Sequence, residues 1–222
     1  AVNFILNDMK KLWIVTELFY PEETSTAFIL TKIANALSDK FDVNVICGPE
    51  SYGRAALEDN PSTKLSLDGR IKIHRVSNCN LNKDKIFTRL LRFLIIGFKL
   101  SFSLWKNAKK QDRVFIVTNP APLLISVALI KRIKKFPLYI LVHDVFPENT
   151  IPAGVISSDK TFGYKLLRKC FNLAYKSADC LIVLGRDMRQ IMKSKLGKNQ
   201  NNTKIEIIEN WAENDIAQLN PV

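Results

Sequence analysis

Apolar positions follow two rhythms that alternate along the chain. Short runs rich in β-branched residues are separated by longer segments in which apolar residues recur every three or four positions. Runs of the first kind are typical of strands, and the second spacing is typical of helices. The pattern predicts seven strands, within residues 12–18, 41–48, 71–77, 113–119, 138–144, 180–185 and 204–210.

Helical segments separate several of these strands. The segment 24–39 has apolar residues at helical spacing after a Thr24-Ser25-Thr26 cluster that offers an N-cap, and 121–135 and 162–178 are further helical segments. Strands that are almost continuously apolar, joined by helices, indicate a parallel sheet covered on both faces. The sequence therefore predicts a doubly wound α/β fold with a mainly parallel sheet of about seven strands.

Length and composition favour one folded core. A chain of 222 residues that is 47% hydrophobic can bury a substantial core, and disordered and disulfide-scaffold classes are excluded. The four cysteines form no C-x-x-C pair, so we expect reduced thiols of a cytoplasmic protein and no zinc site. Only a short apolar run follows Lys10 and Lys11, which argues against a signal peptide. Met9 fits a natural start, with residues 1–8 as an upstream remnant.

Positive charge is concentrated in two windows. The formal net charge is +12, and residues 83–113 and 160–204 carry +7 and +9 of formal charge, so the rest of the chain is slightly acidic. Such localisation suggests a basic face that meets phosphates of nucleic acid, lipid head groups or a phosphorylated substrate. No helix-turn-helix, zinc-finger or aromatic RNA-binding pattern is present, so nucleic acid is not an expected partner.

The segment 85–110 is amphipathic. Its polar residues fall every three, four or seven positions, which places them on one stripe of a helix, and its longest uncharged run is too short to span a bilayer. Three interpretations remain open: a mostly buried layer helix with a narrow solvated stripe, a helix that lies on a membrane or holds a lipid, and a protein-binding helix. The candidate lipid contacts are Arg89, Arg92, Phe93, Lys99, Trp105 and Lys106.

Polar residues gather at the carboxyl ends of the expected strands, where parallel sheets bind their ligands. The turn after the first strand has no G-x-G-x-x-G, and no P-loop occurs, which disfavours dehydrogenases and P-loop enzymes. Thr24, Ser25 and Thr26 still open a helix, whose N-terminus attracts anions. Ordinary N-capping is the alternative role for these hydroxyls.

His143 stands at the end of the fifth expected strand. Asp144 follows it directly, and Pro147 and Glu148 follow after a turn. A neutral imidazole there can donate a hydrogen bond to a substrate hydroxyl, and a nearby carboxylate can orient it or raise its pKa. Because no G-x-S-x-G elbow is present, the site suits positioning and proton sharing rather than hydrolase chemistry.

Four segments together resemble a known family. They read YPEETSTAFILTKIANALSDKFDVNVICG, TNPAPLL, HDVFPENTIPAGVI and IIENWAEND, and in this order they are similar to the N-terminal domain of retaining GT-B glycosyltransferases of family 4. The bacterial cell-surface polysaccharide and colanic-acid type is the most similar subgroup. Its members carry an Asp-Leu-Trp-Pro-Glu-like segment, to which residues 144–148 are similar.

This resemblance implies a domain plan. Residues 9–210 would form the Rossmann-like N-terminal half of a GT-B fold and bind the acceptor. Residues 211–222 would begin the linker to a C-terminal domain, absent from this chain, that binds the nucleotide-sugar. The sugar would be transferred with retained anomeric configuration and without metal or cofactor, since the nucleotide-sugar is a substrate.

The resemblance also implies roles for individual residues. Residues 22–26 would lie beside the donor diphosphate, where the family usually carries a pair of glycines, and His143 would lie near the transferred sugar. Asp144, the second catalytic candidate, and Glu148 would support their loop or contact the acceptor. The expected substrate-binding residues are Glu22, Thr24, Ser25, Thr26, Asn119, Glu148, Arg186 and Asn210.

Partners and location follow from the same resemblance. The acceptor would be a saccharide or a polyprenyl-diphosphate-linked saccharide, and an anionic membrane surface would hold the protein peripherally on the inner face of the cytoplasmic membrane. The alternative is a stand-alone Rossmann-like module without catalysis, which binds a phosphorylated or lipid-linked sugar or a partner subunit.

Overall fold

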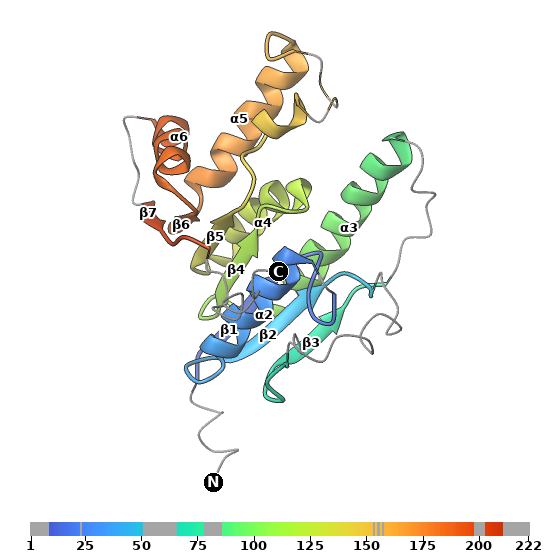
Figure 1. Ribbon diagram of the computed structural model, residues 1–222, viewed down its shortest axis with the longest axis vertical. Helices are drawn as coiled ribbons and strands as arrows, with labels where there is room; N and C mark the ends of the chain where they lie inside the picture. The colour runs from blue at the N-terminus through green and yellow to red at the C-terminus, as the bar shows by residue number, and fades with distance from the viewer. Residues whose placement is uncertain are drawn as a thin grey trace, which may run out of the picture.

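The computed structural model describes residues 9–22, 24–50, 66–77, 86–152, 154, 156, 158–197 and 203–210 (Figure 1). The predictions for residues 1–8 and for the linker at 211–222 lie outside these ranges. The side chain of Arg89, one of the candidate lipid contacts, also lies outside the description.

Strands and helices alternate through the described chain. All seven predicted strands are confirmed: β1 (Lys11–Val15), β2 (Asp42–Cys47), β3 (Lys72–Arg75), β4 (Arg113–Val117), β5 (Leu138–Val142), β6 (Cys180–Val183) and β7 (Lys204–Ile207). The helices are α2 (Ser25–Leu37), α3 (Ile86–Asn107), α4 (Ala121–Lys134), α5 (Phe162–Lys176) and α6 (Arg186–Leu196), with a short 3-10 helix η3 at Glu148–Thr150. The sequence did not predict α6, because few of its residues are apolar and most face solvent.

The seven strands form one parallel sheet in the order β3-β2-β1-β4-β5-β6-β7. The predicted doubly wound, Rossmann-like α/β architecture is therefore confirmed. β1 lies between β2 and β4, so the chain changes direction across the sheet at this point. Because all strands run the same way, their carboxyl ends share one edge, which is where such sheets bind ligands.

The two faces of the sheet are packed differently. Trp13, Val15 and their neighbours on β4, β5 and β6 face a large core built with α3, α4, α5 and α6. Leu12 and Ile14 face the other way, toward a smaller core whose described helix is α2. The indole of Trp13 donates a buried hydrogen bond of 2.9 Å to Asp112, which ties β1 to the loop before β4.

The amphipathic segment forms the single helix α3. Ile96, Leu100 and Leu104 are fully buried against α4 and the sheet, as the layer-helix interpretation requires. The solvated side of α3 is not a narrow polar stripe, however, because Leu94 and Phe98 are 56% and 68% exposed. None of the helices in the described ranges has the length and apolar character that crossing a membrane would require.

Candidate functional site

The candidate site lies at the carboxyl edge of the sheet, where residues 143–150 follow β5. The first two backbone N–H groups of this loop are held by a side chain at the end of β4. The hydroxyl of Thr118, fully buried at the end of β4, accepts hydrogen bonds from the backbone N–H groups of His143 (3.1 Å) and Asp144 (2.9 Å). One side chain therefore fixes the backbone at the point where β5 turns into the loop.

The acidic side chains of the loop are used within the fold. Asp144 accepts a 2.8 Å hydrogen bond from the amide of Asn149, which closes the loop on itself. Glu148 accepts a 2.8 Å hydrogen bond through Oε1 from the ammonium of Lys195 on α6, and its Oε2 makes an ionic contact of 2.7 Å with the same group. Both carboxylates thus support the loop, one of the two roles the resemblance implied for them.

Lys195 on α6 holds the loop at residues 146–148. Its side chain is only 2% exposed, and its ammonium also donates to the carbonyl of Phe146 at 3.1 Å and to the side chain of Asn172 at 3.3 Å. Burial lowers the pKa of Lys195, and the hydrogen bond that its ammonium donates to Glu148 opposes that shift. A second anchor is Tyr175, whose hydroxyl accepts a 3.2 Å hydrogen bond from the N–H of Phe146.

His143 is the first residue of the loop that these contacts hold. Its Nε2 is buried and has no hydrogen-bond partner within the described ranges. Burial lowers the pKa of His143, and the neighbouring Asp144 carboxylate only partly offsets this effect. The imidazole is therefore neutral at neutral pH, and the described part of the chain does not use the hydrogen-bonding capacity of Nε2.

The contribution of the Glu148–Lys195 pair to stability can be measured. Replacing Glu148 with alanine leaves a buried ammonium without its carboxylate, so we expect the free energy of unfolding to fall by about 1 to 3 kcal/mol. The double variant Glu148→Ala/Lys195→Met removes the stranded charge and should recover part of that loss. Urea unfolding measures all three proteins.

Glu206→Ala is the matched control, because Glu206 is an exposed strand residue and its loss should cost little. If Glu148→Ala is no less stable than this control, the ion pair does not anchor the loop.

A second cluster surrounds the turn after β1. Glu17 is 8% exposed, and its carboxylate lies 3.4 Å from the guanidinium of Arg92 on α3. Burial raises the pKa of Glu17, and Arg92 partly reverses the effect. The backbone is also tight here, since a Cβ on Gly48 would lie 2.6 Å from the carbonyl oxygen of Glu17. Only glycine fits this position, and it lets the ends of β1 and β2 approach.

The structure corrects the expected placement of Arg92. The sequence placed Arg92 on a lipid-facing stripe, but its side chain turns inward to Glu17 and is 21% exposed. The helical wheel could not show this, because Arg92 lies in the N-terminal half of α3, which passes the carboxyl edge of the sheet. Arg75 supports the same turn from β3, since its guanidinium donates to the carbonyl oxygens of Tyr20 and Gly48.

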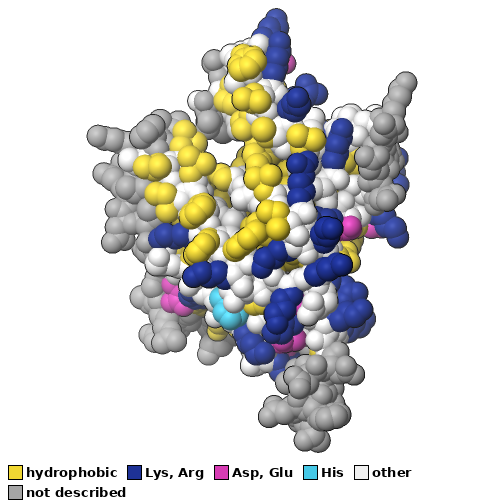
Figure 2. Space-filling model, turned by 180° about the vertical axis from the view of Figure 1, so that it is seen from behind, with side chains coloured by type: hydrophobic (Ala, Val, Ile, Leu, Met, Phe, Trp, Pro, Cys, Tyr) yellow, Lys and Arg dark blue, Asp and Glu magenta, His cyan; other side chains and the backbone are white. Residues whose placement is uncertain are grey.

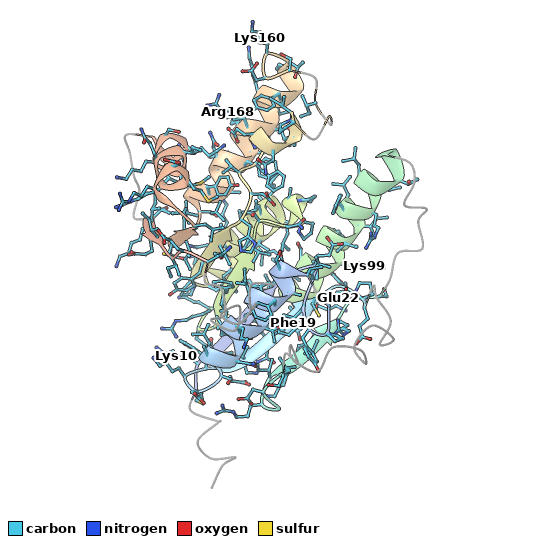
Figure 3. All side chains as sticks on the ribbon, in the orientation of Figure 1. Lys10, Phe19, Glu22, Lys99, Lys160 and Arg168 are labelled. Atoms are coloured by element: carbon cyan, nitrogen blue, oxygen red, sulfur yellow. The ribbon has the colours of Figure 1, made fainter. Side chains whose placement is uncertain are left out.

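The predicted diphosphate contacts at residues 22–26 differ in exposure. Glu22 is 4% exposed, and Figure 3 shows it beside Phe19, whose carbonyl accepts a 3.1 Å hydrogen bond from the Glu22 N–H. The hydroxyl of Thr24 accepts from the N–H of Ala27 and caps α2, which is the ordinary capping role. Ser25 is exposed and Thr26 half-buried at the first turn of the helix.

The remaining predicted residues occupy separate places. Asn119 follows Thr118 at the end of β4 and is half-buried, and Arg186 is exposed at the first position of α6. Asn210 lies elsewhere: together with Leu12, Phe115 and Tyr139 it lines an apolar cavity of about 500 Å³ on the α2 side of the sheet. That cavity face differs from the edge that carries His143, so Asn210 and His143 do not form one constellation in this structure.

Two supporting residues were not among the predicted site residues. Thr118 lies at the end of an expected strand and had no assigned role, and Lys195 lies 47 residues from its partner on a helix that the sequence did not predict. The polar sequence Thr-Asn-Pro directly after an apolar strand was the available signal for Thr118. Among the described residues, no group of three His, Cys, Asp or Glu side chains is arranged to hold a metal ion.

Comparison with solved structures supports the fold. TcCGT1 in complex with UDP superposes with a TM-score of 0.54 at 9% identity, over 94% of this chain and 54% of that one. The N-terminal domain of trehalose-6-phosphate phosphatase from Candida albicans has a TM-score of 0.56 at 10% identity, over 90% of this chain and 48% of that one. The fold matches half of each of these proteins, and the TcCGT1 likeness identifies it as half of a GT-B glycosyltransferase fold.

Sequence comparison is more specific. A probable glycosyltransferase, WbjE of Pseudomonas aeruginosa, is 34% identical over 205 residues, which cover 92% of this chain and 48% of that protein. The chain thus spans about half the length of the relatives it matches. The family model named Glycosyltransferase Family 4 matches residues 29–215, which include Thr118, His143, Lys195 and the part of α2 from Ile29 onward. This chain therefore belongs to glycosyltransferase family 4.

Proposed function

We propose that this chain is the acceptor-binding half of a retaining glycosyltransferase that moves a hexosyl group from a nucleotide-sugar to a lipid-linked saccharide in bacterial surface polysaccharide synthesis. The nucleotide-sugar is bound as a substrate by a C-terminal domain of the longer protein. We further propose that neither a metal nor a cofactor takes part.

The observation that carries this proposal is the half-buried imidazole of His143 at the carboxyl edge of the sheet, whose Nε2 is buried and unpaired within the described residues. Its Nε2 has no partner in the described chain, whereas both acids of the same loop are engaged within the fold. A group that holds a reacting sugar hydroxyl in the right geometry lowers the barrier to transfer. We assign this task to His143, with Thr118 and Lys195 as positioning residues.

The length comparison supports a second domain. WbjE and TcCGT1 are each about twice as long as the part matched by this chain, and TcCGT1 was crystallised with UDP. Membership of glycosyltransferase family 4 supports the transfer reaction. The exposed Ser25 and half-buried Thr26 at the N-terminus of α2 are the described groups best placed to meet a donor phosphate, since a helix N-terminus favours anions.

Transfer by the full-length protein tests the proposal. The protein is incubated with a panel of radiolabelled nucleotide-sugars and with lipid-linked saccharides extracted from bacterial membranes. We expect label from one donor to enter the organic phase, and NMR of the product to show the anomeric configuration of the donor. Calorimetry with UDP should detect binding by the full-length protein and none by residues 1–222.

Two outcomes would overturn parts of the proposal. If no donor is consumed while the chain binds a phosphorylated or lipid-linked sugar, the protein is a binding module without catalysis. If transfer occurs with inversion, or only after a divalent metal is added, the retaining or metal-free assignment is wrong.

A further inference from the structure

One face of the molecule exposes large apolar side chains in a row. Along α3, these side chains recur every three or four residues, so they share one side of the helix. Phe98 and Phe102 are 68% and 49% exposed and stack on each other with ring centroids 6.1 Å apart. The row consists of Leu91, Leu94, Phe98, Phe102 and Trp105.

The row continues onto α4, which packs directly against α3. Small side chains let the two helices approach: a Cβ on Gly97 would lie 3.2 Å from Pro122, and Ser101 and Ser126 share a 2.5 Å hydrogen bond. Exposed Leu129 and Ile133 on α4 therefore lie beside the row on α3.

Helix α5 extends the same side of the sheet. It packs against α4 and exposes Phe162, Leu166 and Leu173, of which Phe162 is 82% exposed. Figure 2 shows these apolar side chains gathered over the outer helices, with Lys and Arg side chains along their lower and right margins. We call the exposed apolar side chains of α3, α4 and α5 the outer helix face. Its extent is unusual, since contiguous apolar surface on a protein generally marks an interaction site.

The charge of these helices has one sign. Together α3, α4 and α5 contain eleven Lys and Arg residues and no Asp or Glu. Lys106 lies over the ring of Phe102 at 4.7 Å, and Lys134 lies over Trp105 at 5.2 Å while it donates to the carbonyl of Ala108. Cationic groups therefore stand at the edge of the aromatic row.

We propose that the outer helix face docks on an anionic lipid bilayer, with the apolar row at the boundary of the acyl chains and the lysines among the head groups. An apolar strip with aromatic residues, flanked by cations and without acids, has the charge complementarity that an anionic membrane surface requires. A second copy of this chain does not, because the exposed lysines of one copy, such as Lys106, would face those of the other with no acid of these helices between them. The docking places the proposed transferase beside a membrane-borne acceptor, and vesicle binding tests it without any sugar transfer.

Vesicle flotation of the full-length protein is the test. Vesicles of phosphatidylcholine with 30 mol% phosphatidylglycerol, a composition chosen for the experiment, should carry the protein to the top of a gradient at about 50 mM salt. Pure phosphatidylcholine should retain at least about tenfold less. The variant Phe98→Ser/Phe102→Ser should lower the partition coefficient by about tenfold or more, because two exposed rings no longer enter the interface.

Matched variants separate the apolar contribution to vesicle binding from the contribution of charge. Ile191→Ser removes an exposed apolar side chain of α6, outside the outer helix face, and should leave flotation unchanged. Lys106→Glu should weaken flotation severalfold, whereas Lys40→Glu, an exposed site beyond the end of α2, should have little effect.

Three results would overturn the proposal. The first is that the protein stays at the bottom of the gradient. The second is that the protein floats but the double phenylalanine variant floats equally well, which means that charge alone binds the vesicles. The third is that the double phenylalanine variant changes the sedimentation mass and not flotation, which means that the outer helix face joins two copies of the chain. Circular dichroism of each variant confirms that it is folded before flotation is interpreted.

Discussion

Replacing His143 with alanine in the full-length protein is expected to lower the rate of sugar transfer by about 10²- to 10⁴-fold, the range typical of a lost hydrogen-bonding or proton-sharing side chain. The loss should appear in kcat, because the backbone of the loop remains held by Thr118, Tyr175 and Lys195. The free energy of unfolding should change little, since Nε2 has no partner to lose in the described chain.

The control is His143→Gln, whose amide can replace one imidazole donor and should retain more activity than alanine. Both variants are assayed by radiolabel transfer and by thermal unfolding. Unchanged transfer by the alanine variant would remove His143 from the mechanism, whatever its stability.

The same variant tests the protonation state of His143. Its pKa in the folded protein lies below the ordinary value of 6.5, with burial as the main cause. Between that lowered pKa and 6.5 the unfolded chain binds more protons than the folded one, so stability rises with pH and is lost as pH falls through this window. We expect His143→Ala to flatten the dependence of unfolding free energy on pH below about 6.5. An unchanged profile would show that the imidazole is not buried in its neutral form.

Replacing Thr118 with valine is expected to lower the free energy of unfolding by about 2 to 4 kcal/mol. Valine has the shape of threonine, but it leaves the N–H groups of His143 and Asp144 without their acceptor, and each unsatisfied buried group costs about 1 to 3 kcal/mol. Because the same hydroxyl fixes the backbone of His143, transfer should also fall more steeply than stability.

Thr118→Ser keeps the hydroxyl and is the matched control. It should restore transfer, although the lost methyl group costs about 1 kcal/mol of stability in the buried site. Denaturant unfolding and kcat are measured for both proteins. If valine and serine variants have the same kcat, the hydroxyl has no positioning role for His143.

Most strands and helices could be predicted from the sequence because the spacing of apolar residues follows the side of each element that is buried. Most of the predicted strands are rich in apolar residues, and in β1, β2, β4 and β5 most residues are buried. Thr24 was recognisable as a cap for the same reason, since the bond between its hydroxyl and Ala27 spans only three residues. Helix α6 was missed although Met188, Ile191, Met192 and Leu196 recur at helical spacing, because polar and basic residues make up the rest of this short segment.

The candidate site was only partly readable. His143 and its loop stand out as a contiguous motif, but the partners that hold the loop are 25 to 49 residues away in the chain. The resemblance implied that Glu148 would support its loop or contact the acceptor, and in the structure its carboxylate pairs with Lys195. Arg92 was assigned to lipid because its helical position looked solvated, and the structure turns it toward Glu17.

By itself, the sequence determined the seven strands, the helices other than α6, the parallel sheet and the edge at which its polar residues gather, because these depend on local patterns repeated along the chain. Only the tertiary structure decided which polar groups remain available there. Hydrogen bonds and ion pairs between distant segments engage some polar side chains and leave others without a partner. The spacing of residues along the chain does not predict which side chains are engaged. The same holds for the outer helix face: periodicity made α3 amphipathic, but the packing of Gly97 and Ser101 against α4 decided that its apolar row would stay exposed.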